Sequence, residues 1–372
     1  MTDHSLSNID RAFYGLGQMT EGIKNIALAV FIMFYYNNLL GLDPVLAGTA
    51  MLIALIIDSI TDPLVGALSD RWRSKWGRRH PFMYAAIAPL VVLFYLLFAP
   101  PPGLGQWGLF AWVTGFSILA RLALTFYVVP HLAMGAELSR DYRERTGLVA
   151  WRQAANSAGA MLTYALAFMV FFPVTQRDPD AYPGFALALA LVMGSSMLIS
   201  ALGTHRLIPR LIQPSQPKAR MTTLAILRET IEALGNRNFR WYFSGALMIY
   251  MVIGVDTALL LYLNSYLWEI SGRPLTFITC GLFFGFLLGA PFTRLLLKRF
   301  EKRTVLIVST LLVGFFQTLP VLAWVAGLMP AEGTIALVTT LTVMRVTQGL
   351  TTVHANVTGG SMLADVADEY EL

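Results

Sequence analysis

Residues 45–69 read VLAGTAMLIALIIDSITDPLVGALS, a stretch in which only Asp58 and Asp62 are charged. A helix that crosses a bilayer needs about 20 mainly apolar residues, so this stretch is long enough to span one. The whole chain agrees, because its 372 residues are 56% hydrophobic and 13% charged, against about 45–50% apolar and about 25% charged in soluble domains. A single soluble core of this size does not hide so much apolar surface. The sequence therefore predicts an integral membrane protein.

Nine further stretches of this kind predict nine further spanning helices. They lie near residues 22–41, 81–100, 107–134, 148–173, 183–205, 241–267, 275–297, 304–328 and 334–363. We therefore expect an all-α polytopic membrane protein with ten helices. Residues 1–17 are polar and lack the basic and apolar regions of a cleaved signal peptide. The first helix is then expected to direct insertion.

Lys and Arg are distributed unevenly among the loops between these helices. One set of loops, together with Arg11, holds 20 basic residues, and the opposite set holds only Arg177 and Arg273. Basic loops stay on the cytoplasmic side, so ten helices place both termini in the cytoplasm of a multi-pass plasma-membrane protein. Because the basic residues share no soluble face, the net charge of +5 does not indicate nucleic-acid binding. The single cysteine, Cys280, allows no intramolecular disulfide.

The chain carries a weak internal repeat around a long proline-containing loop. A shift of 228 positions brings Asp62-Pro63 over Ala290-Pro291, Asp70-Arg71 over Lys298-Arg299 and Ala136-Glu137-Leu138 over Ala364-Asp365-Val366. Two repeats in the same orientation are one architecture of secondary transporters, which bind solute between the repeats. We therefore predict an N-terminal six-helix bundle over residues 1–207, a cytoplasmic linker over 208–237 and a C-terminal bundle over 238–372.

The second repeat ends early, because it holds four predicted helices where the first holds six. The repeat therefore predicts a six-plus-six design of which this chain carries six plus four. A truncated gene product, a fragment and a naturally shortened protein all remain open interpretations.

Asp58 and Asp62 are four residues apart, so they lie on one face of their helix with Cβ atoms about 5–6 Å apart. A charged side chain at the bilayer centre costs about 2.5–3.5 kcal/mol on insertion scales, so each one needs a reason to be there. A cation between the two carboxylates would supply one. Thr61 and the backbone carbonyl freed by Pro63 offer further oxygen ligands for Na⁺, and a shared proton is the alternative. A purely structural pair, neutralised by Arg or Lys from another helix such as Arg121, also remains open.

Other polar side chains fall within the predicted helices. They are Glu21, Lys24, Asn25, Arg121, His131, Arg152, Gln153, Asn156, Asp256, Asn264, Arg345, Gln348, His354 and Asn356. Glu21 and Lys24 have the spacing of a salt bridge within one helix. Arg152 and Asn156 lie one turn apart, which suits hydrogen bonding to solute hydroxyls. Because Lys24 can pair with Glu21 and Arg121 with Asp58 or Asp62, we expect roughly half of these side chains to be structural.

The block Asp62-Pro-Leu-Val-Gly-Ala-Leu-Ser-Asp70-Arg71, followed by Ser74-Lys-Trp-Gly-Arg-Arg-His-Pro81, resembles the glycoside-pentoside-hexuronide:cation symporters. These form the melibiose permease group of the major facilitator superfamily. The resemblance extends over the whole chain through Phe34-Tyr-Tyr-Asn-Asn-Leu-Leu-Gly41, Val129-Pro130, Arg143-Glu-Arg145 and Met362-Leu-Ala-Asp365-Val-Ala-Asp368-Glu369. It implies the major facilitator fold with twelve helices, two of which would follow the Asp365 segment.

The resemblance implies Na⁺-, H⁺- or Li⁺-coupled symport of a sugar or glycoside-like solute by alternating access, in a bacterial inner membrane. It implies no cofactor besides the coupling ion, and small-molecule solute and lipid as partners. By resemblance, Asp58, Asp62, Thr61 and Thr125 bind the cation, and Arg152 lies at the sugar site. Asp70 and Arg71, with Arg78 and Arg79 of the same block, correspond to the cytoplasmic gating motif.

Several positions depart from the melibiose permease pattern. Its two sugar-binding acidic residues correspond here to Gly22 and Val128, and two of its tryptophans to Leu132 and Asn356. These departures argue against galactosides and favour H⁺ over Na⁺, because fewer anionic ligands remain. We expect Glu21 to replace one carboxylate. The substrate-binding prediction comprises Glu21, Asn25, Arg152, Asn156, His354 and Asn356.

Two other classes of function compare with this one as follows. An intramembrane enzyme is disfavoured, because the sequence has no HExxH, no GxSxG and no metal-spaced His or Cys cluster. A truncated, non-transporting fragment and a family member that carries a lipid-like or glycoconjugate solute both remain alternatives.

Overall fold

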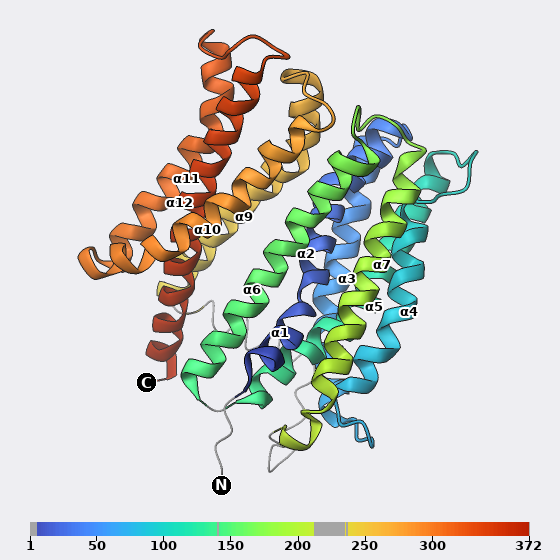
Figure 1. Ribbon diagram of the computed structural model, residues 1–372, viewed down its shortest axis with the longest axis vertical. Coiled ribbons are helices and arrows are strands. Elements are labelled where there is room, and N and C mark those ends of the chain that lie inside the picture. The colour runs from blue at the N-terminus through green and yellow to red at the C-terminus, as the bar shows by residue number, and fades with distance from the viewer. Residues whose placement is uncertain (1–5, 140, 212–234, 236, 372) are drawn as a thin grey trace. The chain divides into compact units, whose positions relative to one another are not determined.

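The computed structural model describes residues 6–139, 141–211, 235 and 237–371 (Figure 1). All ten stretches predicted to span the membrane are helical, which confirms the all-α prediction, and the described residues contain no strand. Eight of the helices are by themselves long and apolar enough to cross a bilayer. The predicted linker over 208–237 lies mostly outside the described residues, except for the short 3₁₀ helix η4 (Ile208–Arg210).

The chain divides into two compact units. The first holds residues 1–166 and 177–223, and the second holds residues 167–176 and 224–372. In the second unit, the segment 167–176 is held by a hydrogen bond from the Arg273 backbone N–H to the Pro173 carbonyl at 3.2 Å and by one from the Gln176 side chain to Ser265. The division into bundles over residues 1–207 and 238–372 stays a prediction.

The helices of the first unit follow one another along the chain. They are α1 (Asn8–Leu16), α2 (Met19–Ile26) continued by the π-helical segments η1 (Ala27–Phe31) and η2 (Phe34–Leu39), α3 (Pro44–Arg71), α4 (His80–Leu97), α5 (Gln106–Leu138), α6 (Tyr142–Ala165) and α7 (Ala181–His205). The π-helical segment η3 (Leu166–Phe171) follows α6. Helix α5 packs against α3 and α4, and α6 packs against α1 and α2. Helix α7 contacts α1, α2 and α4 and is the most buried of the spanning helices.

Local signals in the sequence set where these helices begin. Asp43 caps α3, because its carboxylate accepts hydrogen bonds from the N–H groups of Val45 at 2.8 Å and Leu46 at 3.3 Å, and Pro44 occupies the first turn, where its missing N–H costs nothing. Asp141 caps α6 in the same way through the N–H of Glu144 at 2.8 Å. The α3 cap therefore fixes the start of the helix that carries the two membrane carboxylates.

The second unit holds α9 (Arg237–Tyr262) continued by the π-helical segment η5 (Leu263–Leu267), α10 (Pro274–Arg299), α11 (Lys302–Val325) and α12 (Ile335–Glu371). Helix α12 packs against both α10 and α11. Small residues allow α10 and α12 to approach closely: a Cβ atom on Gly285 would lie 2.1 Å from the Val346 carbonyl oxygen, and one on Gly349 would lie 2.0 Å from that of Leu282.

The backbone repeats itself between the two units at the offset found in the sequence. The chain leaves η2 with a hydrogen bond from Leu40 N–H to the Tyr35 carbonyl at 3.0 Å, and 228 positions later Trp268 N–H donates to the Leu263 carbonyl at the same distance. The next residue has a positive φ in both places, +73° for a glycine in the first and +49° for a glutamate in the second. The internal repeat therefore extends to the backbone conformation of a helix end.

Candidate functional site

The two carboxylates of α3 meet two polar side chains of α5. Arg121 Nη1 donates to Asp58 Oδ2 at 3.1 Å, and the Thr125 hydroxyl lies 3.2 Å from Asp58 Oδ1 and 2.8 Å from Asp62 Oδ1. Arg121 and Thr125 are one helical turn apart, as are Asp58 and Asp62, so the contact joins one face of each helix. The structure thus brings together three of the four residues predicted to bind the cation and adds Arg121.

The fourth predicted cation ligand, Thr61, has a different partner in this structure. Its hydroxyl donates to the backbone carbonyl of Asp58, one turn earlier, at 3.1 Å. A hydroxyl that bonds its own helix still carries a free lone pair, and Pro63 lies inside α3 two residues later. The role of Thr61 as an oxygen ligand therefore stays a prediction.

The two carboxylates differ in their partners. Asp58 is part-buried and paired with Arg121, whose side chain is 10% exposed. Asp62 is exposed, and among the described residues no Lys, Arg or His lies within ion-pair distance of it. With two negative charges and one positive charge, the cluster of Asp58, Asp62, Arg121 and Thr125, hereafter the carboxylate cluster, has a formal charge of −1.

Glu21 and Lys24 on α2 form the predicted salt bridge, with Lys24 Nζ 2.7 Å from Glu21 Oε1. This confirms the pairing that their spacing indicated. Both charges act electrostatically on Asp62, so this pair belongs to the surroundings of the carboxylate cluster. Because the pair is neutral, it leaves the formal charge of the cluster unchanged.

The predicted substrate residues of the first unit lie on two helices that pack together. Glu21 and Asn25 are on α2, and Arg152 and Asn156 are on α6. Asn25 is exposed, and Glu21, Arg152 and Asn156 are part-exposed. The role of these four residues in binding solute stays a prediction.

Gly22 stands where the melibiose permease pattern has an acidic residue, and the structure shows that a side chain does not fit there. A Cβ atom on Gly22 would lie 2.0 Å from the backbone carbonyl oxygen of Asn156. A Cβ atom on Gly159, one turn further along α6, would lie 2.3 Å from the backbone carbonyl oxygen of Met19. The close packing of α2 and α6 thus leaves no room for a carboxylate at position 22, which the sequence alone did not reveal.

The predicted substrate residues of the second unit have different surroundings. His354 on α12 is buried, and its Nδ1 lies 2.7 Å from the Thr293 hydroxyl of α10. Asn356, two residues later, is exposed. A second ion pair lies in the same unit, where Arg345 Nη1 donates to Asp256 Oδ2 at 2.8 Å and to Gln348 Oε1 at 2.9 Å. A solute-binding role for His354 and Asn356 is not tested by these contacts.

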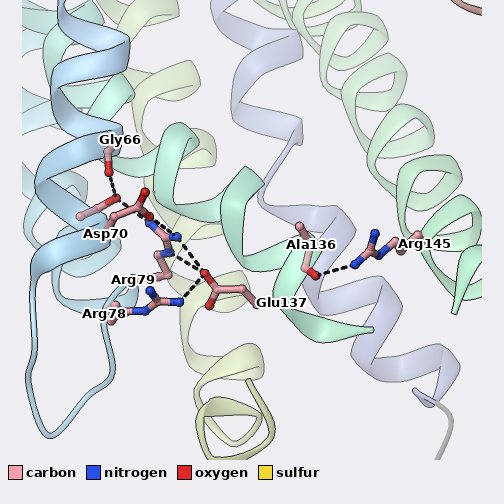
Figure 2. A network of polar contacts seen from close by, with 8 residues as sticks. Gly66, Asp70, Arg78, Arg79, Ala136, Glu137 and Arg145 are labelled. Carbon is pink, nitrogen blue, oxygen red and sulfur yellow. Dashed lines mark hydrogen bonds and ion pairs between the residues drawn. The ribbon is translucent and has the colours of Figure 1, made fainter. Parts of the chain in front are cut away.

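Three of the four predicted gating residues, Asp70, Arg78 and Arg79, belong to a polar network between the end of α3 and the start of α4 (Figure 2). Arg79 is ion-paired with both Asp70 and Glu137, and its Nη1 donates to the Ser69 hydroxyl at 2.7 Å. Arg78 Nη2 donates to Glu137 Oε1 at 2.9 Å. Three of the four predicted residues are thus joined, and the exposed Arg71 has no ion pair among the described residues.

Glu137, at the end of α5, is the centre of this network and was not predicted as a site residue. Its side chain is 12% exposed, against 5% for Arg79 and 50% for Asp70. A signal was present in the sequence, because the internal repeat places Glu137 over the acidic Asp365. An acidic residue at matching positions of both repeats is a reason to expect a partner, although the side chain of Asp365 lies outside the described residues.

Among the described residues, no group of three or more His, Cys, Asp or Glu side chains is arranged to hold a metal ion. The carboxylate cluster offers two carboxylates and one or two hydroxyls, which are oxygen ligands of the kind that hard cations prefer. One oxygen of Asp58 is already bonded to Arg121. Asp58 Oδ1 and the oxygens of Asp62 have no ion-pair partner among the described residues, and their binding of Na⁺ stays a prediction.

Known proteins resemble the chain over most of its length. The model of a family described as MFS/sugar transport protein matches residues 13–372. The inner membrane symporter YicJ of Escherichia coli is 27% identical over 282 residues, which cover 75% of this chain and 58% of YicJ. The isoprimeverose transporter of Lactiplantibacillus pentosus is 24% identical over 82% of this chain and 62% of the transporter. The crystal structure of a D-xylose-proton symporter has a similar fold, with a TM-score of 0.55, 15% identity and coverage of 94% of this chain and 80% of its own. The chain spans 36%, 58% and 40% of the length of three curated relatives it matches.

Proposed function

Because the chain belongs to the family of MFS/sugar transport proteins, we propose that it is a secondary active transporter that couples the entry of a sugar or glycoside-like solute to that of a cation. The coupling ion is H⁺ or Na⁺, and the solute crosses by alternating access. The protein is a multi-pass membrane protein, and we place it in a bacterial inner membrane with both termini in the cytoplasm. The relatives named symporters and the isoprimeverose transporter support this class of solute.

The carboxylate cluster is the observation on which the proposal depends. An ionisable side chain at membrane depth is expensive unless it has a partner or a function. Arg121 compensates one of the two carboxylates, and Asp62 remains exposed and without an ion-pair partner among the described residues. The formal charge of −1 is the charge that one monovalent cation neutralises.

Coupling follows from this charge if the cation and the solute favour the same conformation. Neutralising the cluster removes an unpaired charge, which stabilises the conformation in which solute binds. Such a linkage between two ligands is typically worth about 1–3 kcal/mol. A membrane potential adds about 2.3 kcal/mol per charge for each 100 mV, so inward movement of one cation drives accumulation of a neutral solute.

The polar surface of α2 and α6 is the part of the first unit that we assign to solute. It combines a carboxylate from Glu21, amides from Asn25 and Asn156 and the guanidinium of Arg152. Carboxylates and amide oxygens accept hydrogen bonds from hydroxyl groups, and guanidinium groups donate to them. A neutral polyhydroxyl solute uses both kinds of partner without adding charge.

Asp62→Asn tests the proposal because it removes the uncompensated charge with almost no change in shape. We expect the whole chain in proteoliposomes to lose gradient-driven accumulation of solute in this variant and to keep exchange of labelled for unlabelled solute. Isoprimeverose and D-xylose are the first solutes to assay. Asp256→Asn is the matched control, since Asp256 is also a membrane carboxylate but is paired with Arg345.

Two results would show that the carboxylate cluster does not couple transport or that the chain does not transport. If Asp62→Asn still accumulates solute against its gradient while Asp256→Asn behaves in the same way, the carboxylate cluster is not the coupling site. If the unaltered chain neither accumulates nor exchanges any solute of a broad glycoside panel, the chain does not transport and the fragment interpretation holds.

A further inference from the structure

Arg121 places a fixed positive charge where a coupling ion is expected. Its Nη1 lies 3.1 Å from Asp58 Oδ2, and its side chain is nine-tenths buried. We infer that Arg121 is the resident cation of the carboxylate cluster and that it determines ion specificity by keeping Na⁺ out of this site. The inference rests on the proposed symport, because it concerns which ion the transporter uses.

The oxygen atoms of the cluster show what remains for a metal ion. Asp58 Oδ2 accepts a hydrogen bond from Arg121, and the other Asp58 oxygen and Asp62 Oδ1 both lie within hydrogen-bond distance of the Thr125 hydroxyl. A hard cation such as Na⁺ needs several oxygen ligands at the same time. To use Asp58 Oδ2, Na⁺ would have to take the place of Arg121; to use Asp58 Oδ1 together with Asp62, it would have to bind beside the guanidinium.

Arg121 does not give up this place easily. In the described residues Asp58 is its ion-pair partner, and its buried Nε has no hydrogen-bond partner. Displacing the guanidinium from Asp58 would leave a buried charge without compensation. Removal of one partner of a buried ion pair typically shifts the folding equilibrium toward the unfolded state by about a hundred- to a thousand-fold or more.

Binding of Na⁺ beside Arg121, without displacing it, is also unfavourable. A Na⁺ ion in contact with the carboxylates would lie close to the guanidinium, whose Nη1 is 3.1 Å from Asp58 Oδ2. Two unit charges about 4 Å apart, with an effective dielectric constant of about 20, repel each other strongly enough to weaken binding by about a thousand-fold. The remaining charge of the cluster is on Asp62 alone, and a single carboxylate with one hydroxyl is a weak Na⁺ site.

Titration of the purified whole chain with NaCl tests this inference. The titration is followed by isothermal calorimetry and by thermal unfolding, with choline chloride replacing NaCl at constant ionic strength. We expect the unaltered protein to show no Na⁺-specific heat and no Na⁺-specific change in Tm. Arg121→Ala frees both carboxylates, and we expect it to bind Na⁺ at least about ten-fold more tightly than the unaltered protein.

Two controls separate the charge of Arg121 from the loss of an ion pair in general. Arg121→Lys keeps the positive charge and should remain insensitive to Na⁺. Arg345→Ala removes an ion pair of similar geometry from the second unit, 2.8 Å long, and should also remain insensitive. Arg121→Gln removes the charge but keeps an amide of similar length, and it replaces Arg121→Ala if that variant does not fold.

Na⁺-specific binding by the unaltered protein at submillimolar concentration would overturn the inference without any variant. A folded, charge-free variant at position 121 that gains no Na⁺ affinity would overturn it as well. The titration needs neither solute nor gradient, so a failure of the transport assay and a failure of this inference are distinguishable.

Discussion

Replacement of Glu137 by Gln tests how the network of Figure 2 stabilises the first unit. Glu137 Oε1 accepts three hydrogen bonds, from Arg78 Nη2 at 2.9 Å and from Arg79 Nη2 at 2.8 Å and Nε at 3.1 Å. Glutamine keeps the shape and one acceptor oxygen but removes the negative charge. The buried guanidinium of Arg79 then keeps Asp70 as its ion-pair partner and Ser69 as a hydrogen-bond partner.

The size of the effect follows from burial. Loss of one partner of a buried ion pair costs about 3–5 kcal/mol, and the remaining contact with Asp70 places this case near the lower limit, at about 3 kcal/mol. In a unit of this size each kcal/mol lowers Tm by about 2–4 °C, so Glu137→Gln should lower Tm by about 6–12 °C. Asp70 is 50% exposed, and exposed ion pairs contribute about 0–1 kcal/mol, so Asp70→Asn should lower Tm by no more than about 4 °C.

Thermal unfolding of the purified variants, followed by light scattering, measures both values under one scan rate. Arg78→Gln is a third variant of intermediate burial and should fall between the other two. Equal losses for Asp70→Asn and Glu137→Gln, or an unchanged Tm for Glu137→Gln, would refute the assignment of Glu137 as the centre of the network.

Two further predictions concern the packing of α2 and the start of α1. Gly22→Ala should lower Tm by an amount that corresponds to about 1–3 kcal/mol, because the new Cβ meets the Asn156 carbonyl, whereas Gly48→Ala in α3, with open space around it, should leave Tm unchanged or raise it slightly. Burial raises the pKa of Asp10, but hydrogen bonds within the helix cap and from Arg206 outweigh it, so the pKa of Asp10 lies below its usual value. A carboxyl group whose pKa is lower in the folded than in the unfolded state stabilises the fold at pH values above the unfolded pKa. Asp10→Asn should therefore lower Tm at pH 7. The difference in Tm between the variant and the unaltered protein should disappear only as the pH falls below about 4.

The positions of the helices could be predicted from the sequence because each needs a long apolar stretch, and such stretches are visible without an alignment. The face shared by Asp58 and Asp62 and the pair of Glu21 and Lys24 were equally predictable, since helical periodicity alone decides both. These features depend on residues within one helix.

Features that depend on the rotation of one helix against another could not be predicted. The sequence left open whether Arg121 neutralises Asp58 or Asp62, because that choice depends on how α5 packs against α3. The central position of Glu137 joins the end of α5 to the start of α4, two segments nearly 60 residues apart in sequence. The closed packing at Gly22 depends on the backbone of α6, which no local pattern in α2 reveals.

Movement of ions driven by solute is the most direct test of the central claim that the carboxylate cluster couples a cation to transport. The whole chain is reconstituted in vesicles without an ion gradient, solute is added outside, and entry of H⁺ is followed with an internal pH indicator while entry of Na⁺ is followed with radioactive sodium. We expect solute-dependent entry of H⁺, none of Na⁺, and loss of the H⁺ signal in Asp62→Asn. Solute uptake with no accompanying ion movement, or an H⁺ signal of full size in Asp62→Asn, would contradict it.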